Sequence, residues 1–329
     1  MTSQILTVTV NPSLDVTTST PRLEPQRKLR CGPPVMDAGG GGANVSRAIR
    51  ALGGDSRAFV ALGGNTGRQF AQLLREAGVD YLEFPLPGET RSSMTVMEEA
   101  TGLHYRFVLP GPEQGVETGE EMLAALDRIV DGKVRYVVAS GSLLPGIRAD
   151  FYARLGSIVR RQGAKLILDT HGTALAEGLR GVPYLIRLNE IEARELAHEQ
   201  ERDSSVEQLA LALIARQAAE VVVIGRGERG SLVTTTGGQF SIAPPAVVVR
   251  SMVGAGDSYV AALTLALSRG WSLEDANRYG VAAAASAVTG EATELCNPAG
   301  TEELFKRTGA PVHAGQEPPA PQAAREGRA

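Results

Sequence analysis

Cysteine, lysine and long apolar runs are scarce in this chain of 329 residues. The two cysteines, Cys31 and Cys296, are far apart and form neither a Cys-x-x-Cys pair nor a Cys/His ligand spacing, so the sequence indicates no disulfide framework and no zinc site. No apolar run approaches the roughly 18 residues of a membrane span, and the N-terminus lacks the basic start of a signal peptide. We therefore expect a cytoplasmic protein without a membrane partner.

An excess of positive charge is also absent. The chain has 33 Lys and Arg residues against 37 Asp and Glu residues, which gives a net charge of −4. This balance does not favour a polyanion, so nucleic acid is not expected among the partners. The hydrophobic share of 43% and the 38 glycines are typical of a globular protein with many tight turns. Any small anion must then be bound by a local site.

Short β-branched runs alternate with helical periodicity through most of the chain. Residues 6–10 and 221–224 have the near-continuous apolar character of buried strands, and 44–52 and 205–218 have the pattern of amphipathic helices. This alternation is typical of an α/β protein whose mainly parallel sheet is covered by helices on both faces. We predict one such domain over residues 1–309.

Two segments interrupt the alternation. Residues 16–36 and 90–108 are Thr-rich and alternate between polar and apolar side chains, which is typical of exposed antiparallel strands. They predict a small β-sheet that projects from the main domain. From residue 310 onward the chain is rich in Pro, Ala, Gly and Arg, so its composition predicts a disordered C-terminal tail over 310–329.

The sharpest local signal for chemistry is the run Gly254-Ala255-Gly256-Asp257, which opens a helical stretch that continues to residue 268. Small residues at a helix start leave the first backbone N–H groups accessible, and the helix dipole there favours negative charge. The run therefore predicts an anion hole. The alternative is that Asp257 is an ordinary helix cap.

A second glycine-rich segment, Gly39 to Gly42, leads into Asn44 and the predicted helix. Glycines allow the backbone to approach a ligand closely, and the amide of Asn44 can both donate and accept. A flexible hinge is the alternative interpretation.

Asp15 lies just after the first predicted strand, where ligands gather in parallel α/β sheets. Its carboxylate could accept hydrogen bonds from sugar hydroxyls. The alternative is that Asp15 is a turn residue.

Gly225, Gly227 and Gly230 match the dinucleotide pattern Gly-x-Gly-x-x-Gly after a predicted strand. That fingerprint requires a helix to follow, whereas residues 231–236 continue as a predicted strand. A Rossmann oxidoreductase is therefore disfavoured.

Taken together, these segments resemble the ribokinase-like (PfkB) carbohydrate kinases, and within them the phosphofructokinase branch. The motifs occur in the family's order and spacing and cover residues 4–308. They are Asn11-Pro-Ser-Leu-Asp15, Gly39 to Asn44, Ser140-Gly-Ser-Leu143, Asn189-x-x-Glu192 and Gly254 to Asp257. The resemblance implies a ribokinase-like three-layer α/β/α domain with a β-sheet lid, and a homodimer formed through that lid.

The resemblance also implies an activity, the ATP-dependent phosphorylation of fructose 6-phosphate at its C1 hydroxyl. Asp257 would take the proton, and the N–H groups of Gly254, Ala255 and Gly256 would stabilise the transferring group. The sugar phosphate would be bound by Asp15, Lys28, Gly40, Gly41, Asn44, Arg91, Arg106 and Ser140. ATP would be bound by Arg187, Asn189, Gly225, Gly227 and Gly230, with Mg²⁺ arranged by Glu192 and Asn189 through water. The alternative interpretation of Asn189 and Glu192 is simple capping of a helix start.

The nucleotide motifs depart from the family pattern. The usual Lys-Pro-Asn is Arg187-Leu188-Asn189, and the usual Ser/Thr-Leu-Gly of the ATP turn is Gly225-Arg226-Gly227, without the hydroxyl. Two alternatives within the class are 1-phosphofructokinase and tagatose 6-phosphate kinase. A catalytically degenerate sugar-phosphate-binding regulatory protein is a third alternative, which the altered turn favours and the intact Asp257 opposes.

Overall fold

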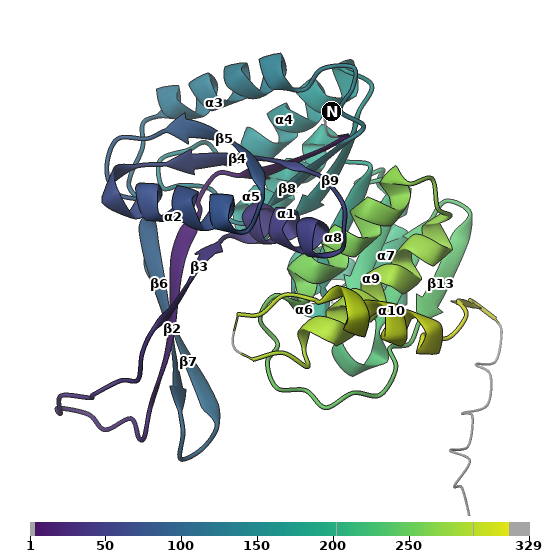
Figure 1. The fold of residues 1–329 in the computed structure, drawn as a ribbon. Helices are drawn as coiled ribbons and strands as arrows, with labels where there is room; N and C mark the ends of the chain where they lie inside the picture. The colour runs from purple at the N-terminus through teal and green to yellow at the C-terminus, as the bar shows by residue number, and fades with distance from the viewer. Residues whose placement is uncertain (1–3, 202, 292, 316–329) are drawn as a thin grey trace, which may run out of the picture.

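Ten strands form one large sheet in the computed structural model, which describes residues 4–201, 203–291 and 293–315 (Figure 1). The strands are β1 (Ile5–Thr9), β4 (Arg57–Leu62), β5 (Asp80–Pro85), β8 (Tyr136–Ser140), β9 (Lys165–Asp169), β10 (Leu185–Asn189), β11 (Val221–Gly225), β12 (Ser231–Thr235), β13 (Gly238–Ile242) and β14 (Val312–His313). Their order across the sheet is β14-β13-β12-β11-β10-β9-β8-β1-β4-β5. From β5 to β11 every pairing is parallel, and β12 to β14 add an antiparallel edge.

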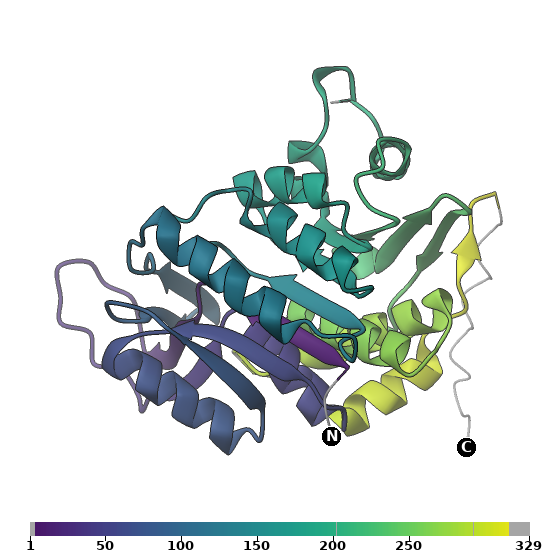
Figure 2. The same cartoon turned by 90° about the horizontal axis from the view of Figure 1, so that it is seen from above.

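Helices cover both faces of this sheet, which makes three layers (Figures 1 and 2). One face packs against α3 (Val116–Ile129), α4 (Phe151–Arg161), α5 (Gly172–Gly178), α6 (Glu190–Glu195) and α7 (Val206–Ala215). The other packs against α1 (Gly41–Ala51), α2 (Gly64–Glu76), α8 (Ala255–Ser268) and α9 (Leu273–Ala287), with α10 (Pro298–Arg307) lying on α9. The predicted α/β class is therefore confirmed.

The two hydrophobic cores follow from strand alternation. Along β1, Leu6 and Val8 point into one core and Ile5 into the other, because successive side chains of a strand face opposite sides. Helix α8 is apolar nearly all round and is buried along most of its length, with Val260 and Leu263 fully covered. Such a helix is stabilised by its packing inside the protein, which fixes its N-terminus rigidly.

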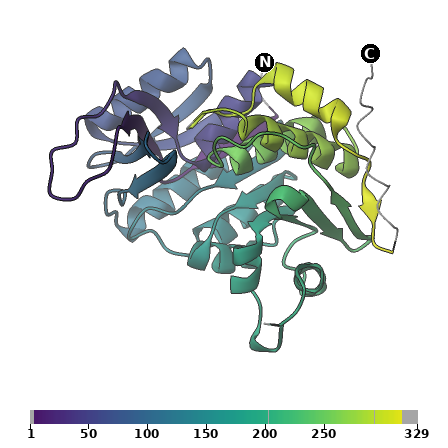
Figure 3. The same ribbon diagram turned by 90° about the horizontal axis from the view of Figure 1, so that it is seen from below.

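A separate small sheet projects from the large domain (Figures 1 and 3). Its order is β3-β2-β6-β7, and its strands are β2 (Ser13–Thr20), β3 (Val35–Gly39), β6 (Arg91–Glu98) and β7 (Leu103–Val108). The predicted projecting sheet is thus present, but its strands are not all antiparallel. Strands β2 and β6 pair in parallel, with Asp15 opposite Ser93, because both leave the large domain in the same direction. Only the outer pairs, β2–β3 and β6–β7, are antiparallel.

The prediction of a tail disordered from residue 310 needs correction for its first part. Residues 310–315 are described, and Val312–His313 forms β14, in which His313 pairs with Phe240 of β13. Without β14, strand β13 would be an edge strand with unpaired N–H and C=O groups. These groups pair with β14 although the sequence around it is polar. Residues 316–329 of the predicted tail lie outside the described residues.

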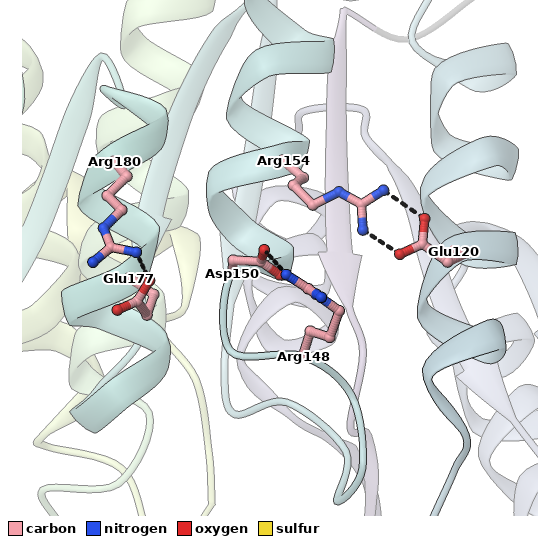
Figure 4. A network of polar contacts seen from close by, with 6 residues as sticks. All are labelled: Glu120, Arg148, Asp150, Arg154, Glu177 and Arg180. Atoms are coloured by element: carbon pink, nitrogen blue, oxygen red, sulfur yellow. Dashed lines mark hydrogen bonds and ion pairs between the residues drawn. The ribbon is translucent and has the colours of Figure 1, made fainter.

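Ion pairs between arginines and acidic residues lie on the outer face of α3, α4 and α5 (Figure 4). Arg154 of α4 contacts Glu120 of α3, Arg148 lies 2.7 Å from Asp150, and Arg180 contacts Glu177. Exposed pairs of this kind are screened by water and contribute little, so they stabilise the helix layer only modestly. Among the described helices, none combines the length and the apolar character that crossing a bilayer requires.

Candidate active site

The predicted site residues, apart from Lys28, converge toward the carboxyl ends of the parallel strands. Ser140 ends β8, Asn189 ends β10 and Gly225 ends β11. Strand β1 leads through the loop at Asn11 into the small sheet, so that sheet projects from the same end. The N-termini of α1 and α8 complete the arrangement. This end of a parallel sheet is where α/β proteins bind their ligands.

Asp257 lies in the first turn of α8 and contacts α1. Gly254 is the N-cap in the left-handed region at φ 77°, and no side chain caps the helix. The carboxylate of Asp257 instead accepts a hydrogen bond from the amide of Asn44, whose Nδ2 lies 2.9 Å from Oδ2. The alternative interpretation of Asp257 as an ordinary cap is therefore wrong. The N–H groups at this helix start remain available to an anion.

The carboxylate of Asp257 titrates in an unusual range. Burial is the main reason that its pKa is raised from 3.8 to about 7, and the nearby charge of Asp169 adds to this effect. The hydrogen bond from Asn44 and the charges of Arg187 and Arg106 act in the opposite direction. A carboxylate with a pKa near 7 can accept a proton effectively at neutral pH.

Arg187, on β10, lies among carboxylates. Its Nη1 is 3.6 Å from Oδ1 of Asp169, the last residue of β9. Burial lowers the pKa of Arg187, but Asp169, Glu192 and Asp257 outweigh burial, so the net pKa is raised. A Cβ on Gly256 would lie 3.0 Å from Nη1 of Arg187. The glycine therefore lets the guanidinium pack against the start of α8.

Asp169 was not among the predicted site residues. Its position gave a signal that could have identified it, because Asp169 directly follows the apolar run 166–168, and ligands gather at the carboxyl ends of such strands. Its Oδ2 accepts a long hydrogen bond from Oγ of Ser140, at 3.5 Å.

On the sugar side, Asp15 of β2 is buried and one of its carboxylate oxygens, Oδ1, has no hydrogen-bond partner. Burial raises its pKa and Asp37 adds to this, whereas Ser13, Arg106 and Arg91 act against it. A buried acceptor without a partner is costly, and a ligand hydroxyl would relieve that cost. The arrangement fits a site that binds hydroxyl groups.

Two arginines of the small sheet lie near Asp15. The guanidinium of Arg91 donates to the carbonyl oxygen of Asn11 at 3.2 Å and to Oγ of Ser93 at 3.3 Å. Burial lowers the pKa of Arg91, and Asp15 and Arg106 act on it in opposite directions. Arg106 is exposed on β7, yet its charge reaches both Asp15 and Asp257.

Lys28 is not brought to this cluster within one chain. It is exposed on the loop 21–34 that joins β2 to β3, at the outer end of the small sheet (Figure 1).

The glycines before α1 are required by close packing. Gly40 has φ 106°, a conformation that residues with side chains rarely adopt. A Cβ on Gly41 would lie 2.0 Å from Oγ of Ser140, so the start of α1 packs directly onto the end of β8. This contact explains the run better than a flexible hinge does.

Gly225, Gly227 and Gly230 form the turn between β11 and β12. The N–H of Arg226 donates to the carbonyl oxygen of Gly230 at 2.7 Å, and Gly227 and Gly230 have positive φ angles. The chain continues as strand β12, so the prediction against a Rossmann fingerprint is confirmed. The side chain of Arg226 does not replace the missing hydroxyl: it lies 3.1 Å from Glu207 of α7 and 2.9 Å from Ser241 of β13.

Asn189 and Glu192 form a capping box at the start of α6. Oδ1 of Asn189 accepts from the N–H of Glu192 at 2.9 Å, and Oε2 of Glu192 accepts from the N–H of Asn189 at 2.7 Å. Burial raises the pKa of Glu192. Among the described residues, no cluster of three or more His, Cys, Asp or Glu side chains has the geometry of a metal site. The excess of carboxylates around Arg187 nevertheless fits Mg²⁺, which keeps most of its waters and needs few protein ligands.

Comparisons with known proteins show the family to which this chain belongs. The family described as pfkB family carbohydrate kinase matches residues 9–300. A protein of Mycobacterium tuberculosis named ATP-dependent 6-phosphofructokinase isozyme 2 is 44% identical over 318 residues, which are 95% of this chain and 92% of that protein. A protein of Xanthomonas campestris named 1-phosphofructokinase is 33% identical over 273 residues, with 81% of this chain and 85% of that protein covered.

Solved structures show the same fold. The crystal structure of phosphofructokinase-2 from Escherichia coli in complex with potassium matches with a TM-score of 0.86 at 35% identity, covering 93% of this chain and 99% of that chain. The ribokinase-like fold is thereby confirmed, as is the likeness to the minor 6-phosphofructokinase of enteric bacteria that Lys28-Leu-Arg-Cys31 and the four glycines predict. This chain belongs to the pfkB family of carbohydrate kinases and is a sugar kinase that transfers a phosphate group to a hydroxyl.

Proposed function

We propose that this kinase transfers the γ-phosphate of ATP to the C1 hydroxyl of fructose 6-phosphate, which yields fructose 1,6-bisphosphate and ADP. One observation carries the proposal: a carboxylate with a pKa of about 7 lies in the first turn of an uncapped buried helix, beside an amide that orients it. The name of the relative that is 44% identical supports fructose 6-phosphate as the substrate.

In the proposed reaction, Asp257 accepts the proton of the C1 hydroxyl as that oxygen attacks the γ-phosphorus. The bond between this phosphorus and the bridging oxygen of ADP breaks in line. The N–H groups of Gly254, Ala255 and Gly256 stabilise the negative charge on the transferring group, because they are fixed before the reaction begins. Mg²⁺, held through water by Asn189 and Glu192, would neutralise charge on the nucleotide phosphates.

The two substrates would occupy opposite sides of Asp257. Asp15, Gly40, Gly41, Asn44 and Ser140 bind the sugar, and Arg91 and Arg106 bind its 6-phosphate. Lys28, which does not reach this cluster within one chain, would join them only across the homodimer proposed below. Arginine suits this role because its guanidinium can donate two parallel hydrogen bonds to a phosphate. Arg187 and the turn of Gly225, Gly227 and Gly230 bind ATP. Both substrates are cytoplasmic metabolites, which supports a cytoplasmic enzyme that acts in glycolysis.

We also propose a homodimer formed through the small sheet. The face of that sheet opposite Asp15 carries a row of apolar side chains that pair across its four strands: Met36, Val16, Met94 and Phe107. Met36, Met94 and Phe107 are exposed by 47%, 43% and 49%. A contiguous exposed apolar face is typical of an interaction surface. Met94→Asp should convert a dimer into a monomer in sedimentation velocity, whereas Leu211→Asp on the distant helix α7 should leave the dimer intact.

The test of the activity is ADP release with Mg·ATP, measured in parallel with fructose 6-phosphate, fructose 1-phosphate, tagatose 6-phosphate and fructose. We expect the highest kcat/KM with fructose 6-phosphate. Higher kcat/KM with another sugar phosphate would instead identify one of the alternatives within the class. No turnover with any of them would favour the degenerate binding protein, for which the intact Asp257 and its Asn44 partner give no support.

The role of Asp257 has its own test. Asp257→Asn should lower kcat by about 10²–10⁴-fold, the usual contribution of a general base, while binding of fructose 6-phosphate in calorimetry changes little. Turnover close to normal in this variant would remove Asp257 from the proposed role.

A further inference from the structure

A chain of polar contacts runs from the small sheet to Asp257. Oγ1 of Thr293 donates to Oδ2 of Asp37 at 2.8 Å, and the other oxygen of Asp37 forms an ion pair with Arg47 of α1. Nη1 of Arg47 donates to Oδ1 of Asn44 at 3.2 Å. Nδ2 of Asn44 then donates to Oδ2 of Asp257 at 2.9 Å. Neither Arg47 nor Asp37 was singled out by the sequence motifs.

This chain determines which way the Asn44 amide points. A guanidinium carries only donors, so the atom of Asn44 that faces Arg47 has to be the carbonyl oxygen. The NH₂ group must then face Asp257. Arg47 is held in its own orientation by Asp37 and by a second hydrogen bond, from Nη1 to the carbonyl oxygen of Ala38 at 3.2 Å. Its side chain is 18% exposed, so water competes little for these contacts.

The orientation of the amide matters because an N–H donor stabilises the ionised carboxylate. The hydrogen bond from Asn44 opposes the effect of burial on Asp257, as do the charges of Arg187 on β10 and Arg106 on β7, whereas Asp169 on β9 adds to that effect. The bond also occupies Oδ2, which leaves Oδ1 to receive a proton. An amide turned by 180° would present its oxygen to Asp257 and would favour the protonated form.

We propose that Arg47 is a positioning residue of this kinase: held by Asp37, it fixes the Asn44 amide so that Asp257 is kept ionised and presents Oδ1 to the substrate hydroxyl. The inference rests on the proposed role of Asp257 as the base. Arg47 acts through Asn44 and takes no part in proton transfer itself. Its ion pair with Asp37 is neutral as a unit, so its effect is one of geometry.

The test is the pH dependence of kcat between pH 5.5 and 9 in Arg47→Met, which keeps the length of the side chain and removes its donors. We expect the acidic limb of the profile, where kcat rises with pH as Asp257 ionises, to move upward by about one pH unit. A hydrogen bond to a charged group contributes a free energy equivalent to about one pKa unit. The kcat should fall about fivefold near pH 7 and recover at pH 9, while KM for ATP changes less than about twofold. Arg47→Lys, which retains a charged donor, should show a smaller shift.

The matched control is Arg50→Met on the same helix, because Arg50 is exposed and pairs with Asp55 instead of Asn44. It should leave the acidic limb in place. If Arg47→Met does not fold, Asp37→Asn and Arg47→Lys carry the same measurement.

A uniform loss of kcat at every pH, or an acidic limb that stays in place, would show that Arg47 is only structural. The parallel measurement on Asp257→Asn separates the two proposals. If Asp257→Asn loses turnover and the acidic limb of Arg47→Met does not shift, only the inference about Arg47 fails. If Asp257→Asn keeps its turnover, the base assignment fails and the inference fails with it.

Discussion

Replacing Asp257 with Asn should stabilise the ligand-free protein, and the gain should depend on pH. The folded protein holds the proton of Asp257 up to about pH 7, whereas the unfolded chain releases it near 3.8. The wild-type protein therefore loses stability as the pH rises through this interval, because the folded state binds more protons. Asparagine does not titrate, and its side-chain oxygen can still accept the hydrogen bond from Asn44.

The size of the effect follows from the interval between 3.8 and about 7. At roughly 1.4 kcal/mol per pH unit, the ionised carboxylate costs the folded protein about 4 kcal/mol above pH 7. Asp257 is only half-buried, so water screens part of this cost and the figure is an upper limit. The variant should be close to the wild type in stability near pH 4 and more stable by about 2–4 kcal/mol at pH 8.

The assay is urea unfolding of both proteins, followed by circular dichroism between pH 5 and 8.5 without substrates. The control is Asp80→Asn, which removes an exposed carboxylate paired with Arg57 and should change the free energy of unfolding by less than about 1 kcal/mol at any pH. A difference between Asp257→Asn and the wild type that stays constant across the range would refute the assignment of a raised pKa to Asp257.

Two further predictions concern the binding side chains. Arg91→Ala should raise KM for fructose 6-phosphate by about 10–100-fold and KM for ATP by less than about threefold, because charge-assisted hydrogen bonds to phosphate are lost; an equal rise in both KM values in steady-state kinetics would contradict this. Gly256→Ala should lower kcat at least tenfold, since its Cβ would lie 3.0 Å from the guanidinium of Arg187 and displace it, whereas Gly309→Ala, which meets no atom within 4 Å, should be neutral. Wild-type kcat in Gly256→Ala would show that this packing is unimportant.

Much of the architecture was predictable because local patterns and tertiary structure agree. The alternation of apolar strands and amphipathic helices predicts the three layers, and the glycine runs predict the starts of α1 and α8. Among the central strands, β10 is the one that the local sequence pattern does not predict. Its apolar run is short and is interrupted by Arg187, whose charge is compensated by Asp169 from another strand. Such compensation is not visible in a local window of sequence.

The parts of the site that sequence could not predict depend on contacts between distant segments. Asp37 lies outside the motifs, and its partner Arg47 looks like an ordinary polar position on an amphipathic helix. Thr293 reaches Asp37 across 256 residues of sequence. Strands β2 and β6 belong to two separate segments that leave the large sheet, so their parallel pairing cannot be predicted from either segment alone. The sequence motifs identify the residues that match the family pattern. The residues that hold them in position are identified only by the packing of distant segments.

The edges of the two sheets differ in how readily they accept another strand. At one end of the large sheet, β5 carries Asp80, Glu83 and Pro85, and charge together with a missing N–H group discourages pairing with a second molecule. At the other end, β14 covers part of β13, and its His313 lies 3.4 Å from Glu274 of α9. The exposed strand β7 of the small sheet has no such cover among the described residues. Pairing with a strand of another molecule is therefore discouraged at β5 and partly blocked at β13, whereas β7 leaves one edge of the small sheet open to it.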